Sequence, residues 1–125
     1  MNKEIIATSD APSAIGPYSQ AVQSGNFIFL SGQIALDITG QIVSDEVQAQ
    51  THQVMKNIAA ILKAAKTDFN AIVKTTIFLK DMNDFAAVNT VYASYFEGNF
   101  PARETVEVSR LPKEVRVEIS VIAAV

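Results

Sequence analysis

The sequence predicts an α+β fold in which two helices pack on one face of a sheet. Two segments, 45–65 and 82–99, show the apolar spacing of amphipathic helices. The segments around them are rich in aromatic and β-branched residues, which is typical of strands. The predicted order is hairpin, helix, strand, helix and two strands, and this order indicates helices gathered on one side of a mixed sheet.

The first half of the chain contributes a hairpin and a helix. Residues 26–36 (NFIFLSGQIAL) are expected to form a strand. A glycine-containing turn leads into a short returning strand within 37–43 (DITGQIV), which completes the predicted hairpin. The helix of 45–65 follows, with Ser44 or Asp45 available to cap its first turn.

The second half begins with a strand over 71–82 (AIVKTTIFLKDM). The helix of 82–99 has capping residues at Asn83 and Asp84, and Gly98 is expected to end it. Strands over 103–109 and 115–124 then complete the sheet.

The last strand has two different faces. Its first face is apolar and is expected to lie under the helices, whereas the second is mixed, which a subunit interface with polar pockets would explain. The apolar set is Val115, Val117, Ile119 and Val121, and the mixed set is Arg116, Glu118, Ser120 and Ile122.

The composition narrows the class of protein. At 125 residues we expect one domain, spanning 1–125. The net charge of −3, with scattered basic residues, argues against a nucleic-acid partner. Charged residues make up only 18% and the mean hydropathy is +0.20, so we expect some surface to be covered by copies of the same chain.

The sequence has no cysteine and a single histidine, His52, which is expected to be solvated, so we expect no metal site. Without a signal-peptide pattern or a long apolar run, we expect a cytoplasmic location.

Arg103 and Glu118 are the strongest candidates for chemistry. Both are charged residues in segments that are otherwise typical of buried strands, and a buried charge is costly unless it is paired. Spacing alone leaves two interpretations open. Arg103 is either paired with Glu107 or Glu118, or it is available for a charged ligand. Glu118 is either paired with Arg116 or Arg103, or it has a raised pKa and exchanges protons.

Five further residues are candidates for a binding site, each with a simpler structural interpretation. Tyr18 follows a Gly-Pro turn and is suited to a pocket wall. Ser31 and Gly32 interrupt an apolar strand, where glycine marks a bulge or a close approach. Thr105 shares a strand face with the arginine described above. Asn89 lies off the apolar stripe of its helix. The residues taken singly favour simple packing for Tyr18 and Thr105 and an exposed amide for Asn89.

Four motifs together resemble the Rid (reactive-intermediate deaminase, or YjgF) family. They are AIGPYSQAV at 14–22, SGQI at 31–34, KTTIFLKDMNDFAAVN at 74–89 and PARETVEVSRLPKEVRVEI at 101–119. The resemblance implies a chorismate-mutase-like fold and a homotrimer with a barrel core and clefts between subunits. It also implies cofactor-independent hydrolysis of 2-imino acids, chiefly 2-iminopropanoate and 2-iminobutanoate, to 2-oxo acids and ammonia.

The resemblance also implies roles for individual residues. Arg103 matches the arginine that grips the substrate carboxylate, and Glu118 matches the carboxylate that orients water or relays protons. The residues that match the lining of the cleft are Tyr18, Ser31, Gly32 and Asn89. Thr105 stands where the family usually has cysteine, so the resemblance implies no role for its side chain. The backbone carbonyl and amide of that position are still expected to be available to the water or the imine.

Two alternatives stay open at this point. The first is a trimeric module of the same fold that binds a small carboxylate metabolite and regulates a partner protein without turnover. The second is a ribonuclease or translation inhibitor, an activity attached to some family members. The acidic balance and the lack of a basic, aromatic track make the second less favoured.

Overall fold

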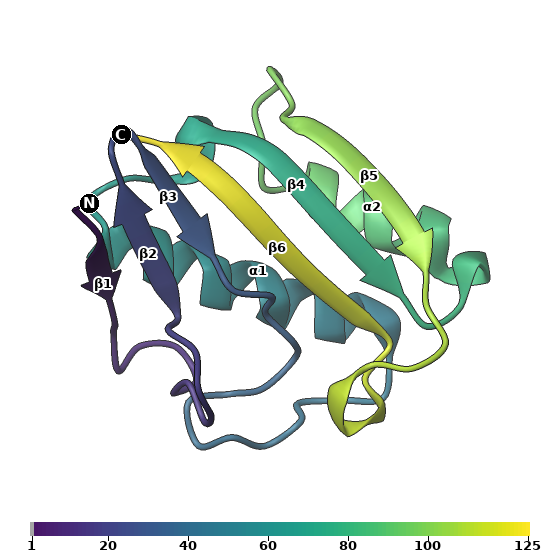
Figure 1. The fold of residues 1–125 in the computed structure, drawn as a ribbon. Coiled ribbons are helices and arrows are strands. Elements are labelled where there is room, and N and C mark those ends of the chain that lie inside the picture. The colour runs from purple at the N-terminus through teal and green to yellow at the C-terminus, as the bar shows by residue number, and fades with distance from the viewer. Residues whose placement is uncertain (1) are drawn as a thin grey trace.

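A six-stranded mixed sheet carries two helices on one face (Figure 1). The computed structural model describes residues 2–125. Its elements are β1 (Glu4–Ile6), β2 (Ala21–Ser24), β3 (Phe27–Leu30), α1 (Val47–Ala64), β4 (Ile72–Leu79), α2 (Phe85–Ala93), β5 (Ala102–Glu107) and β6 (Val117–Ala124). The strand order is β1-β2-β3-β6-β4-β5, and each neighbouring pair is antiparallel except β4 and β5, which are parallel. The predicted class and the placement of both helices are confirmed.

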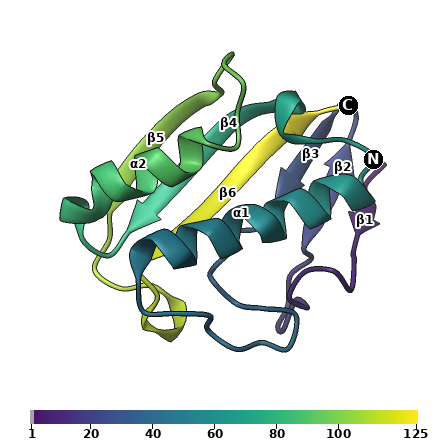
Figure 2. The ribbon, with the colours of Figure 1, turned by 180° about the vertical axis from the view of Figure 1, so that it is seen from behind.

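The core lies between this sheet and the helices. Seen from behind, α1 crosses the sheet and α2 lies beside it over β4 and β5 (Figure 2). Helix α1 buries Val54, Ile58 and Leu62 completely, as its apolar spacing predicts. On β6, Ile119 is fully buried and Val121 is 3% exposed, so the expected apolar face does lie beneath the helices.

The opposite face of the sheet is open. Phe27 and Phe29 of β3 are 44% and 45% exposed, and Val106 of β5 is also exposed. A surface of this kind, built from large apolar side chains, is typical of a site of association. Among residues 2–125, no helix has the length and apolar character needed to cross a membrane.

The predicted hairpin was placed wrongly. The real hairpin joins β2 to β3, with Gly25 at φ 58° in its turn, whereas residues 37–43 form only an isolated bridge between Leu36 and Ile42. The Asp37 carboxylate accepts hydrogen bonds from the backbone N–H groups of nearby residues, and this favours a tight loop over a strand. β1 and β2 were not predicted.

The second helix is shorter than predicted. It ends at Ala93 rather than near Gly98, and a 3₁₀ turn over Met82–Asp84 precedes it. Asp84 does not cap the helix with its side chain. Its carboxylate instead accepts hydrogen bonds from the Arg116 guanidinium at 2.7 and 3.2 Å. An ion pair between the residues that directly precede α2 and β6 has replaced the predicted cap.

Candidate active site

All predicted site residues except Thr105 line one of two cavities. The larger, of about 590 Å³, is lined by Tyr18, Ser31, Gly32 and Glu118 together with parts of the loop before β2. We call it the Glu118 cavity. The smaller, of about 300 Å³, is lined by Asn89, Tyr92, Phe100 and Arg103. We call it the Arg103 cavity.

Arg103 is held by aromatic rings rather than by acids. Its guanidinium carbon lies 5.2 Å from the ring centroid of Tyr92 and 5.6 Å from that of Phe85, both on α2. Among residues 2–125 it forms no ion pair. The candidate partner Glu107 instead accepts a hydrogen bond from the backbone N–H of Met82. Stacking on ring faces holds the cation without engaging its N–H donors, so they stay free for a ligand.

The rings of Phe85 and Tyr92 form what we call the aromatic clamp, and the Tyr92 ring is held by a buried hydrogen bond. The Tyr92 hydroxyl lies 2.8 Å from the Thr75 hydroxyl, and burial raises the pKa of the Tyr92 phenol. Phe85 and Tyr92 are aromatic residues of the segment predicted as the second helix, and sequence reasoning missed their role beside Arg103. Their seven-residue spacing on α2, facing the strand of Arg103, was the only available signal.

The side chain of Glu118, on β6, points to the sheet face opposite the helices. Burial raises the pKa of its carboxyl, and among residues 2–125 it has no ion-pair partner. The candidate partner Arg116 binds Asp84 instead. Gly32 allows this placement, since a Cβ at that position would lie only 2.8 Å from Cδ of the glutamate.

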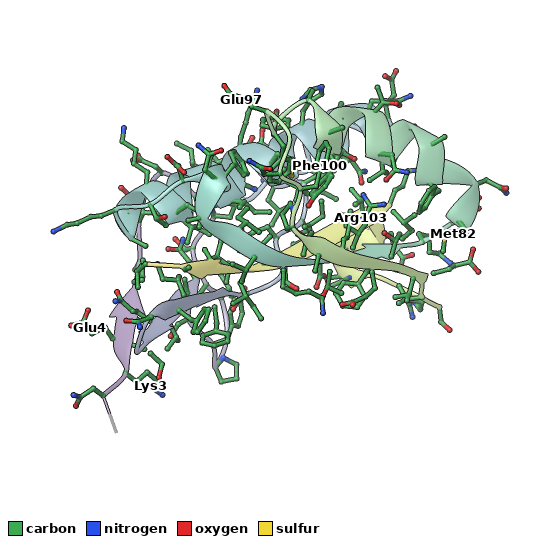
Figure 3. All side chains as sticks on the ribbon, turned by 90° about the horizontal axis from the view of Figure 1, so that it is seen from above. Lys3, Glu4, Met82, Glu97, Phe100 and Arg103 are labelled. Atoms are coloured by element: carbon green, nitrogen blue, oxygen red, sulfur yellow. The ribbon has the colours of Figure 1, made fainter. Side chains whose placement is uncertain are left out.

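The sheet separates the two groups. Arg103 is in register with Thr75, whose hydroxyl contacts Tyr92 on the helix side. Glu118 is in register with Phe78, which lies on the open face. Viewed along the sheet, Arg103 lies on the side of the helices (Figure 3). Arg103 and Glu118 of one chain therefore point to opposite sides, and neither can neutralise the other.

Ser31 and Thr105 differ from the sequence-based expectation, whereas His52 agrees with it. The Ser31 hydroxyl donates a hydrogen bond to the backbone carbonyl of Ser19 at 2.6 Å, so it is already engaged. Thr105 lines neither cavity, and its buried hydroxyl has no hydrogen-bond partner among residues 2–125. His52 is exposed, as predicted, and its Nδ1 lies 2.8 Å from the Tyr95 hydroxyl.

Both the sequence and the fold of this chain match those of known proteins. A family model described as Endoribonuclease L-PSP matches residues 8–125. The chain is 57% identical to a RutC family protein of Pyrococcus horikoshii, with 97% of each chain covered. It is 52% identical to the mouse 2-iminobutanoate/2-iminopropanoate deaminase, over 97% of this chain and 90% of that one. A Rid family crystal structure from Yersinia pestis superposes with a TM-score of 0.97 at 52% identity, over 99% of this chain and all of that chain.

Proposed function

We propose that this chain, which belongs to the Endoribonuclease L-PSP family of Rid proteins, hydrolyses 2-imino acids to 2-oxo acids and ammonia. The proposed substrates are 2-iminopropanoate and 2-iminobutanoate, for which the mouse relative is named. The observation that carries the proposal is the Arg103 guanidinium. It is fixed by two rings, has no acidic partner among residues 2–125 and borders a cavity. A planar fork of free donors suits a carboxylate.

The site is proposed to form between subunits of a homotrimer. The sheet keeps Arg103 and Asn89 apart from Tyr18, Gly32 and Glu118 within one chain, so no single chain can present both groups to one small substrate. The open sheet face, with Phe27 and Phe29 exposed, supplies an apolar surface for association. Arg103 of one subunit would then bind the substrate carboxylate, and Glu118 of its neighbour would transfer protons.

The proposed chemistry follows from these two groups. Arg103 holds the carboxylate and so fixes the imine carbon. Glu118 accepts a proton from water as the oxygen bonds to that carbon and the C=N electrons move to nitrogen. The imine enters protonated, so the neutral carbinolamine takes the proton from Glu118 on nitrogen, its C–N bond breaks as ammonia leaves, and its hydroxyl gives a proton back to Glu118 as the carbonyl forms. Because burial raises the Glu118 pKa, the same carboxyl is suited to accept and return a proton. This route calls for no cofactor, and we place it in the cytoplasm.

A trapping assay tests the reaction. A serine or threonine dehydratase generates the imine in the presence of semicarbazide, and semicarbazone formation is followed with and without the protein. We expect the protein to suppress trapping, and Arg103→Ala to abolish the suppression. Equal trapping with and without the wild-type protein would favour the alternative of a non-catalytic module that binds a small carboxylate.

Subunit mixing tests the shared site. Arg103→Ala and Glu118→Gln are each expected to be inactive alone, but mixed trimers contain clefts that take Arg103 from one variant and Glu118 from the other. Random mixing at equal amounts restores about a quarter of the clefts. If both residues acted from one chain, no mixture would regain activity.

A further inference from the structure

The loop that carries Tyr18 is fastened at both ends by side chains. Residues 12–19, which we call the Tyr18 loop, connect the N-terminal segment to β2 and form one wall of the Glu118 cavity. Within the loop, Tyr18 is 54% exposed and Ile15 is 85% exposed. The tyrosine N–H donates to the carbonyl of Gly16 at 2.9 Å, which is a contact inside the loop itself. The placement of the loop therefore depends on its two ends.

Gln20 fastens the first end. Its side chain is 4% exposed, and both atoms of its amide bind backbone. Its Oε1 accepts from the Thr8 N–H at 2.7 Å, while its Nε2 donates to the carbonyls of Thr8 at 3.0 Å, Pro12 at 2.8 Å and Ala11 at 3.5 Å. A buried amide whose donors and acceptor are all engaged fixes the chain it binds.

Ser31 fastens the second end. Its hydroxyl donates to the carbonyl of Ser19 at 2.6 Å, and its backbone N–H donates to the carbonyl of Gln20 at 2.9 Å. The bonded carbonyl belongs to the residue directly after Tyr18. Ser31 also lines the cavity, but its proton is engaged with the loop and is not directed at a ligand.

We propose that Gln20 and Ser31 are positioning residues, which act on the reaction by holding Tyr18 at the wall of the Glu118 cavity. This inference rests on the proposed function for its kinetic consequence, but the placement of the loop does not depend on any activity. It changes the expected role of Ser31 from a residue that contacts the substrate to one that places another residue.

Fluorine NMR tests the placement directly. The chain has three tyrosines and no tryptophan, so protein labelled with 3-fluorotyrosine gives three signals, and Tyr18→Phe assigns the one from the loop. In Gln20→Ala and in Ser31→Ala we expect this signal to move toward the shift of a free tyrosine, while those of Tyr92 and Tyr95 stay in place.

Gln50→Ala is the matched control. Gln50 is 2% exposed and also binds backbone at both ends of its amide, but its partners are Ser44 and Arg116, which line neither cavity. All three fluorine signals are expected to stay in place in this variant. An unmoved Tyr18 signal in Ser31→Ala, or an equal displacement in Gln50→Ala, would overturn the inference even if Gln20→Ala failed to fold.

A double-mutant cycle tests the kinetic consequence. We expect Gln20→Ala to lower kcat/KM about ten- to a hundred-fold, since a displacement near 1 Å can cost about a hundred-fold. In a Tyr18→Phe background the same substitution is expected to have little further effect, because the residue that it positions has lost its hydroxyl. Equal effects in both backgrounds would show that Gln20 acts through general stability. If no variant, including wild type, turned over imino acids, the proposed function would fail while the NMR result still decided the placement.

Discussion

Replacing Gly32 by alanine should remove activity while leaving the fold intact. A Cβ at this position would lie 2.8 Å from Cδ of Glu118, and ordinary contacts of a Cβ begin at 3.4 Å. The carboxyl carbon must therefore move by at least 0.6 Å. The obstructing atoms belong to the end of a flexible side chain, and Gly32 is not at a positive φ, so the backbone can accept alanine. The movement affects the one carboxylate proposed to transfer protons.

The expected loss in kcat/KM is about a hundred-fold, because misplacing a catalytic group by about 1 Å has that cost. This corresponds to about 2.7 kcal/mol of transition-state stabilisation. The melting temperature should change little. Gly25→Ala is the matched control: no heavy atom lies within 4 Å of its would-be Cβ, but φ is +58°. That variant should lose about 1 kcal/mol of stability and keep its activity.

Calorimetry at equal protein concentration and the trapping assay measure the two effects. A Gly32→Ala protein with full activity would refute the proposed role of Glu118. A strongly destabilised one would show that the glutamate cannot move aside.

Three other substitutions have separable outcomes. Arg103→Lys should lower kcat/KM about ten- to a hundred-fold, since an ammonium cannot replace the bidentate fork, and near-normal kinetics would contradict the carboxylate grip. Burial raises the folded-state pKa of Glu118 above its ordinary 4.5, so the folded protein binds the extra proton and its stability falls as pH rises through that pKa. Glu118→Gln should therefore be more stable than wild type at neutral pH but equal to it near pH 3, as urea titrations would measure, and parallel stability curves would contradict this burial cost. Thr105→Val should gain about 1 kcal/mol, because the buried hydroxyl has no partner among residues 2–125, and thermal unfolding that shows a loss would reveal a partner contributed by another subunit.

Prediction from the sequence succeeded where a long periodic pattern reflects the burial of apolar side chains. Alternation along β6 and the helical spacing of α1 both reflect burial, and both were confirmed. It failed where short local contacts decide the outcome. β1 has only three residues, and the loop near Asp37 is set by hydrogen bonds of one side chain.

The candidate site shows the same division. Charge in apolar segments drew attention to Arg103 and Glu118, but spacing alone could not say whether the two residues pair with one another. That question is decided by sheet register, which places one beside the helices and the other on the open face. The Phe85 and Tyr92 clamp was hidden for a related reason. An aromatic residue on an apolar stripe has the same pattern whether it fills the core or supports a cation.

Because the sheet separates Arg103 from Glu118, the proposed activity would depend on assembly of the subunits. A freshly folded monomer would hold each half of the machinery with nothing to complete it, so it would be inert toward its substrate. For the proposed homotrimer, the amount of working enzyme in dilute solution would rise roughly with the cube of the free chain concentration. The rate of synthesis would then set a threshold of chain concentration below which the protein is present but inactive.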